Sequence, residues 1–133
     1  MIIKICGIQN ENTLYCCDKN KVDFFGMIFY KNSPRNISMQ NAKKLQKVSD
    51  QLNINGVGVF VNKNIYELKQ IVKEIQLRFV QLHGIESDLY INDLKQIGIK
   101  TIKSISISNK QDLKKIDHYK NADYFLFDYK PLK

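Results

Sequence analysis

The 133-residue chain lacks features that are typical of several classes of protein, and each absence excludes one of them. It has no tryptophan, two prolines and no low-complexity tract, so nothing in it marks a linker. No apolar run reaches the roughly 18 residues of a membrane-spanning helix, and the first residues lack the apolar stretch and cleavage site of a secretory signal. We therefore expect a cytoplasmic protein without a membrane partner. The length fits one globular domain, which we predict to cover residues 1–133.

Cysteine and histidine are also scarce. Cys6, Cys16 and Cys17 are an odd number of thiols, and the adjacent pair cannot easily form a bridge, so we expect reduced cysteines. His83 and His118 are the only imidazoles, and no Cys-x-x-Cys pair exists. Because a structural zinc site needs about four such ligands, we expect no metal.

Arginine is nearly missing from a chain with a net charge of +8. Arg35 and Arg78 are the only two, and the lysines are spread along the sequence without a run of three. Nucleic-acid surfaces cluster their charge and use arginine for bidentate contacts. A solvated lysine surface is therefore the preferred interpretation, and we expect no nucleic-acid partner. An α/β binding module with a basic surface remains an alternative.

What the sequence does contain is a regular alternation of short apolar runs and amphipathic stretches. Helical stretches are predicted over residues 10–20 and 110–119, and helices are predicted to begin at Ser38, Asn64 and Ser87. The predicted strands are residues 2–6, 24–29, 57–61, 79–82, 101–107 and 124–127.

Continuous apolar strands that are each separated by one helix belong in a parallel sheet, so the fold class is α/β. Two architectures fit this pattern, an open doubly wound sheet and part of a (β/α)8 barrel. A dinucleotide-binding Gly-x-Gly-x-x-Gly motif is absent, because the sequence at 56–58 (Gly-Val-Gly) lies at the start of a strand instead of opening a helix.

Polar residues follow the predicted strands, and ligands bind at this end in both architectures. Cys6 could be a small buried side chain or, as a thiolate, a nucleophile or base. Asp128 could cap a following helix or act as a general acid. Arg35 could hold a carboxylate bidentately or form a loop salt bridge. Gln81 and His83 lie at the end of the fourth strand, where His83 could orient a substrate or be structural.

Five segments resemble the phosphoribosylanthranilate isomerase family of tryptophan biosynthesis, in order and at similar spacing. They are residues 4–8 (KICGI), 29–35 (FYKNSPR), 57–62 (VGVFVN), 80–86 (VQLHGIE) and 126–128 (LFD). The resemblance implies a (β/α)8 barrel of the TIM type. It also implies an Amadori rearrangement of N-(5-phosphoribosyl)anthranilate to 1-(2-carboxyphenylamino)-1-deoxyribulose 5-phosphate. No metal or organic cofactor is implied, and the partner is this small phosphorylated substrate.

The resemblance also implies roles for individual residues. Cys6 matches the general base of the family, Asp128 its general acid, and Arg35 the residue that engages the anthranilate carboxylate. His83 and Gln81 fall in a family motif and are expected to contact the substrate or support its site. Asp128 would protonate the ring oxygen, and Cys6 would then remove the proton from C2.

The chain departs from the family after Asp128. A full barrel needs about 200 residues or more, and the family continues into a glycine-rich loop and two further strands that bind phosphate. Tyr129 also replaces a small hydroxyl residue. We therefore expect an incomplete barrel of about six βα units, poorly active alone and able to self-associate through its open sheet edges. The alternative is a non-catalytic partial barrel that assembles with another chain.

Overall fold

A computed structural model describes residues 1–129, so the last four residues of the predicted domain lie outside it. It contains six strands in one parallel sheet, in the order β1-β2-β3-β4-β5-β6. The strands are β1 (Lys4–Cys6), β2 (Phe24–Ile28), β3 (Asn55–Phe60), β4 (Phe79–Leu82), β5 (Lys100–Ile107) and β6 (Tyr124–Tyr129). The helices between them are α1 (Glu11–Lys19), α2 (Met39–Ser49), α3 (Ile65–Ile75), α4 (Asp88–Lys95) and the 3-10 helix η1 (Lys110–His118).

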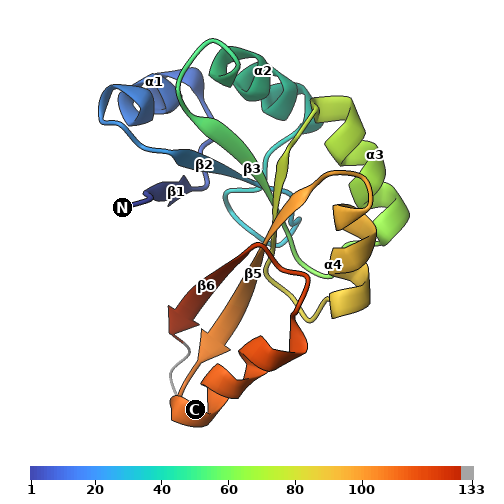
Figure 1. Ribbon diagram of the computed structural model, residues 1–133. Coiled ribbons are helices and arrows are strands. Elements are labelled where there is room, and N and C mark those ends of the chain that lie inside the picture. The colour runs from blue at the N-terminus through green and yellow to red at the C-terminus, as the bar shows by residue number, and fades with distance from the viewer. Residues whose placement is uncertain (130–133) are drawn as a thin grey trace.

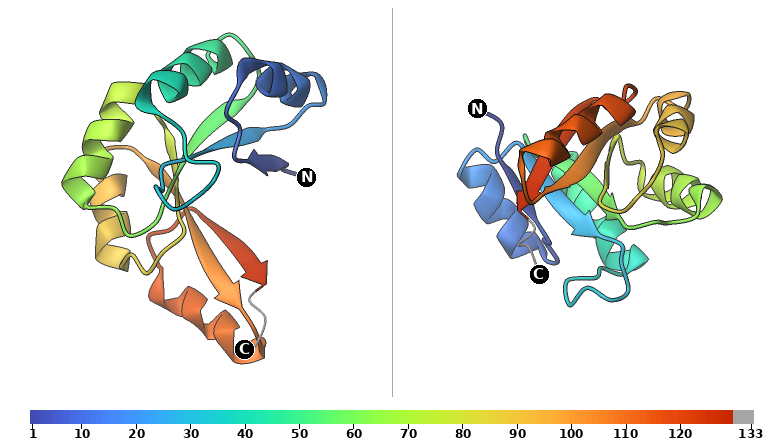
Figure 2. Two further views of the ribbon diagram at one scale, coloured as in Figure 1. Left: turned by 180° about the vertical axis from the view of Figure 1, so that it is seen from behind. Right: turned by 90° about the horizontal axis from the view of Figure 1, so that it is seen from below.

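The sheet is curved, and its helices all cover the convex side (Figure 1). Each strand pairs with the next strand in the sequence, so the strand order never reverses. A doubly wound sheet would reverse its order and carry helices on both faces. The chain therefore forms consecutive βα units of the barrel type, and Figure 2 shows β1 and β6 at the two ends of the curved sheet.

The hydrophobic core fills the space between the convex face of the sheet and the helices. Alternate strand residues such as Phe25, Met27 and Leu82 are fully buried there, as the two-residue period of a strand requires. The helices contribute buried apolar side chains at the spacing that the sequence predicts, namely Leu14, Ala42, Leu45, Leu68, Val72, Ile91 and Leu94.

The predicted helix starts are confirmed. Ser38, Asn64 and Ser87 each accept a hydrogen bond from a backbone N–H of the first turn of α2, α3 and α4. Asn10 caps α1 in the same way. These caps satisfy N–H groups that have no partner inside the helix.

The last helix and the last strand differ from the prediction, the helix in its type and the strand in where it ends. The helix at Lys110–His118 is a 3-10 helix, and β6 continues through Asp128 to Tyr129 because β5 offers ladder partners as far as Ile107. Asp128 pairs with Ser106 inside the ladder. It therefore does not follow the strand, and it caps no helix within residues 1–129.

The concave face of the sheet carries the other half of the strand residues. Phe24 and Phe79 meet there edge to face, with ring centroids 4.9 Å apart. Near the amino ends of the strands, a cavity of about 230 Å³ is lined by side chains from both ends of the sheet, including Ile2, Ile102 and Tyr124. β1 and β6 therefore face each other across this side of the molecule. No helix within residues 1–129 is long and apolar enough to cross a membrane.

Candidate active site

The carboxyl ends of the strands bring together residues that are far apart in the sequence. His83 directly follows β4, and its Nε2 lies 3.5 Å from Oδ2 of Asp128 on β6. The two side chains are 38% and 54% exposed, so both remain open to solvent and to a ligand. An imidazole and a carboxyl group thus face each other at the rim of the concave face.

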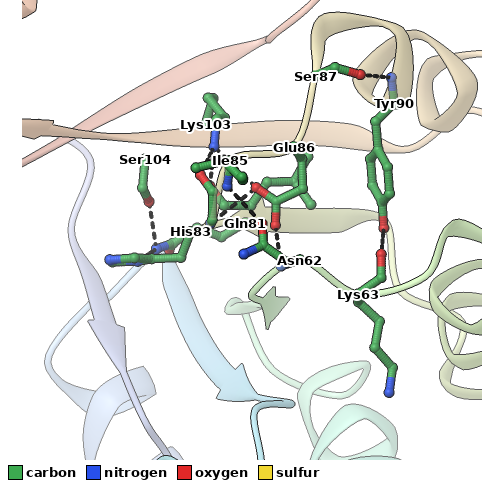
Figure 3. A network of polar contacts seen from close by, with 12 residues as sticks. Asn62, Lys63, Gln81, His83, Ile85, Glu86, Ser87, Tyr90, Lys103 and Ser104 are labelled. Carbon is green, nitrogen blue, oxygen red and sulfur yellow. Dashed lines mark hydrogen bonds and ion pairs between the residues drawn. The ribbon is translucent and has the colours of Figure 1, made fainter.

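A buried carboxamide lies behind this pair. Nε2 of Gln81 lies 3.1 Å from Nδ1 of His83 and donates to Oγ of Ser104 at 3.0 Å (Figure 3). Gln81 and Ser104 are both buried. A line of polar contacts therefore runs from β5 through β4 to Asp128 on β6.

Cys6 ends β1 at the other edge of the sheet and is half-buried. A Cβ atom on Gly26, its ladder partner, would lie 2.7 Å from Sγ of Cys6 and 3.2 Å from Nζ of Lys4. A larger residue at position 26 would force the thiol and the lysine to move, so this glycine leaves room for both on the concave face. The prediction did not include Gly26, although a glycine inside the bulky run Phe-Phe-Gly-Met-Ile is a signal for such a close approach.

Arg35 reaches from the loop after β2 to the end of β1. Its Nη1 donates to the backbone carbonyl of Cys6 at 3.0 Å, and its own backbone N–H donates to Oγ of Ser33. Gly7 makes this approach possible, since it has a φ of +86° and a Cβ atom there would lie 2.6 Å from Cδ of Arg35. The predicted base and the predicted carboxylate-binding residue are therefore neighbours.

A buried ion pair at the loop that follows His83 was not predicted. Glu86 and Lys103 have side chains that are only 2% and 1% exposed, with Nζ 3.1 Å from Oε2. Lys103 also donates to the carbonyl oxygens of Gly84 at 2.6 Å and Leu82 at 3.4 Å. The expectation of a solvated lysine surface is therefore wrong for Lys103, because its ammonium group is surrounded by acceptors.

The same carboxylate connects two loops. Glu86 accepts hydrogen bonds from the backbone N–H of Asn62 at 2.7 Å and of Gly84 at 3.0 Å (Figure 3). Asn62 has a left-handed φ of 49°, and its Oδ1 accepts the N–H of Ile85 at 2.8 Å. The loops after β3 and β4 are thereby held to each other, and the backbone that follows His83 is fixed.

One further contact supports this arrangement. The hydroxyl of Tyr90 on α4 donates to the carbonyl of Lys63 at 2.9 Å, and burial raises the pKa of Tyr90. Helix α4 is therefore also attached to the loop after β3. Within residues 1–129, no three acidic, histidine or cysteine side chains are close enough to hold a metal ion.

Known proteins match this chain over nearly its whole length. A family model described as N-(5'phosphoribosyl)anthranilate (PRA) isomerase matches residues 3–132. The chain belongs to this family. A relative named N-(5'-phosphoribosyl)anthranilate isomerase from Clostridium acetobutylicum is 38% identical over 126 residues, which are 95% of this chain and 59% of the relative. A relative of the same name from Trichodesmium erythraeum is 39% identical over 139 residues, 100% of this chain and 60% of its own length.

Solved structures of the PRA isomerase family have the same fold. The phosphoribosyl anthranilate isomerase of Thermotoga maritima matches with a TM-score of 0.89 at 30% identity, covering 100% of this chain and 64% of that one. Another match, with a TM-score of 0.86 at 30% identity, is a complex with reduced 1-(o-carboxyphenylamino)-1-deoxyribulose 5-phosphate, covering 98% of this chain and 66% of that one. The chain thus spans about 60% of the length of the curated relatives it matches, and the predicted TIM-barrel type of fold is confirmed.

Proposed function

We propose that this member of the PRA isomerase family acts on N-(5-phosphoribosyl)anthranilate, a small phosphorylated substrate, in the cytoplasm. The reaction is the Amadori rearrangement to 1-(2-carboxyphenylamino)-1-deoxyribulose 5-phosphate, without metal or organic cofactor. One observation carries the proposal. The two strands at the ends of the sheet each bring one proton-transfer group, the thiol of Cys6 and the carboxyl of Asp128, to the carboxyl side of the sheet.

The proposed chemistry balances with these two groups alone. Protonated Asp128 donates to the ring oxygen of the ribose while the C1–O bond breaks, and the nitrogen lone pair forms an iminium ion. The thiolate of Cys6 then takes the proton from C2, which leaves an enolamine that tautomerises to the ketone. One proton enters and one leaves, so an acid and a base on opposite sides of one sugar are sufficient.

Arg35 is proposed to bind the anthranilate carboxylate. Its guanidinium is anchored by one N–H on the carbonyl of Cys6, and a guanidinium has further donors in the same plane. The carboxylate would then lie beside the base. His83 and Gln81 are proposed to support the acid at the other edge, through the contacts of His83 with Asp128 and of Gln81 with His83.

The first test is turnover by the full chain. Substrate is made in the cuvette from anthranilate and a phosphoribosyl donor by the preceding transferase, and its fluorescence is followed. We expect slow turnover that falls by about 100-fold or more in Cys6→Ala and in Asp128→Asn. Cys16→Ala, which changes an exposed thiol on α1, should retain the activity. Turnover that Cys6→Ala leaves unchanged would contradict the proposed base.

The second test is binding, which needs no turnover. The probe is reduced 1-(o-carboxyphenylamino)-1-deoxyribulose 5-phosphate, measured by calorimetry. Arg35→Leu should weaken binding by about 10-fold or more, because a charged hydrogen-bond partner is lost. Arg78→Leu is the matched control, since Arg78 lies at the amino end of the strands beside Asn55. Equal losses in both variants would contradict the assignment of Arg35.

A second candidate function is assembly without catalysis. Within residues 1–129, β1 pairs with β2 alone and β6 with β5 alone. Strand edges of this kind pair with other chains, and the apolar cavity between the two ends of the sheet adds surface to bury. Analytical ultracentrifugation of the full chain tests this candidate. A defined oligomer supports it, and a monomer at micromolar concentration opposes it.

A further inference from the structure

The buried carboxamide of Gln81 is more than a packing contact. Gln81 is 2% exposed and projects from β4. Its nitrogen lies within hydrogen-bond distance of two groups, Oγ of Ser104 at 3.0 Å and Nδ1 of His83 at 3.1 Å. An amide nitrogen only donates. The ring nitrogen that faces it must then be the unprotonated one.

The opposite orientation of the amide satisfies fewer groups. As it stands, both N–H bonds of Gln81 have acceptors, and its Oε1 is the one atom of this amide without a partner among residues 1–129. Exchanging the nitrogen and the oxygen would instead leave two buried N–H groups where Oε1 now lies. A buried N–H without a partner is rarer than a carbonyl oxygen without one, so the amide is best satisfied with its nitrogen toward His83.

We propose that Gln81 is a positioning residue that fixes His83 as the tautomer protonated on Nε2 and directs this N–H toward Asp128. Nε2 is the ring atom that lies 3.5 Å from Oδ2 of Asp128. Ser104 holds the amide in place, because its hydroxyl accepts the second N–H of Gln81. The line of polar contacts thus begins at Ser104 on β5 and ends at the carboxyl group of Asp128 on β6.

The tautomer of His83 affects which oxygen of Asp128 carries a proton when Asp128 acts as an acid. A bare Nε2 would accept the proton of Asp128 and keep it between the two side chains. A protonated Nε2 presents an N–H to Oδ2, 3.5 Å away, which favours a proton of Asp128 on Oδ1, where a substrate can take it. This consequence rests on the proposed function, whereas the tautomer itself does not.

The decisive experiment uses the full chain, labelled with nitrogen-15, without substrate and at a pH where imidazoles are neutral. Only His83 and His118 contribute ring signals, and His118→Gln assigns them. We expect His83 protonated on Nε2, together with a scalar coupling through the hydrogen bond between its Nδ1 and the side-chain nitrogen of Gln81. A proton on Nδ1, or no coupling, would overturn the inference.

Substitutions of Gln81 then test whether this residue sets the tautomer of His83. Gln81→Met should abolish the coupling and allow protonation of Nδ1 in part of the molecules. Gln81→Glu places an acceptor beside Nδ1 and should reverse the tautomer. Gln40→Met, at an exposed position, should leave both signals of His83 unchanged. A folded Gln81→Glu protein that keeps the original tautomer would overturn the role of Gln81, and the coupling in the unsubstituted chain decides the matter if neither variant folds.

The inference and the proposed function fail separately. The coupling requires neither substrate nor turnover, so its presence in a chain without activity would leave the tautomer intact and remove only the isomerase proposal. Turnover in a chain whose His83 carries its proton on Nδ1 would support the isomerase proposal and overturn the tautomer. In an active chain, Gln81→Met should lower kcat more than it changes KM, because Gln81 acts through His83 on the acid.

Discussion

The centre of the sheet and its two edges are built differently. At the centre, Glu86 and Lys103 are almost fully buried, and their charged groups have several hydrogen-bond partners. At the edges, Cys6 is half-buried and Asp128 is exposed. Local stability depends on buried contacts and paired strands. The loop carrying His83 therefore has a rigid support, whereas the proposed base and acid lie on strands that pair on one side only within residues 1–129.

The largest expected effect comes from breaking the central pair. Lys103→Met leaves the carboxylate of Glu86 buried without its cation, and the free energy of unfolding should fall by about 3–5 kcal/mol. Urea denaturation of the full chain measures this loss. The control is Lys43→Met, which breaks an exposed pair with Glu74 and should cost less than about 1 kcal/mol. Similar losses in the two variants would remove the contrast between centre and surface.

The next effect compares one substitution at two places. Leu82→Ala on β4 removes a fully buried side chain and should cost about 2–5 kcal/mol. Leu126→Ala on β6 removes a side chain that is only partly buried, so it leaves a smaller cavity and should cost about half as much or less. Both are measured by thermal and urea unfolding. An equally large loss at Leu126 would mean that β6 is packed as firmly as β4.

A smaller effect is expected at the helix that follows the central network. Ser87 accepts the N–H of Tyr90 and caps α4. Ser87→Ala should destabilise the protein by about 1 kcal/mol. Ser87→Asn supplies another capping oxygen and should retain most of the stability, and both variants are compared by urea unfolding. A neutral alanine variant would show that α4 is held by packing and by the hydroxyl of Tyr90 alone.

The smallest effect on stability is expected at Asp112, in the first turn of the 3-10 helix after β5, and it appears only in acid. The hydrogen bond from Lys115, followed by those from the backbone N–H groups of Ser108 and Asn109, lowers the pKa of Asp112 to about 2. Because the folded value lies below the unfolded one, this carboxylate stabilises the protein above about pH 4, and the contribution is lost as the pH falls through about 2. Carbon-13 NMR of the Asp112 carboxyl measures the midpoint. A midpoint near the ordinary value of about 4 would contradict these contacts.

Local signals explain what could be predicted. Helix caps are properties of a few consecutive residues, which is why Ser38, Asn64 and Ser87 mark the helix starts correctly. Strand positions follow from apolar runs, and β4 has the bounds that its apolar run predicts. The direction of the chain through a parallel sheet also places Cys6 and His83 at the carboxyl ends of their strands, where ligands bind in folds of this type.

Contacts between strands could not be predicted in the same way. Lys103 resembles any exposed lysine in the sequence, because its burial depends on carbonyl groups at the end of β4 and a carboxylate 17 residues away. The same is true of Gln81 with Ser104 and of His83 with Asp128, which depend on the register of three strands. Register is a property of the assembled sheet.

The order of the βα units, the helix caps and the family all follow from the residues alone, because each depends on residue types at short spacing or on motifs in order. Which side chain faces which follows only from the assembled fold. That fold buries Lys103 against Glu86, places Asp128 inside β6 instead of after it, and brings Gln81 to Ser104. A hydrogen bond between strands needs atoms within about 3 Å, and the curvature and register that bring them there arise only when the strands have assembled.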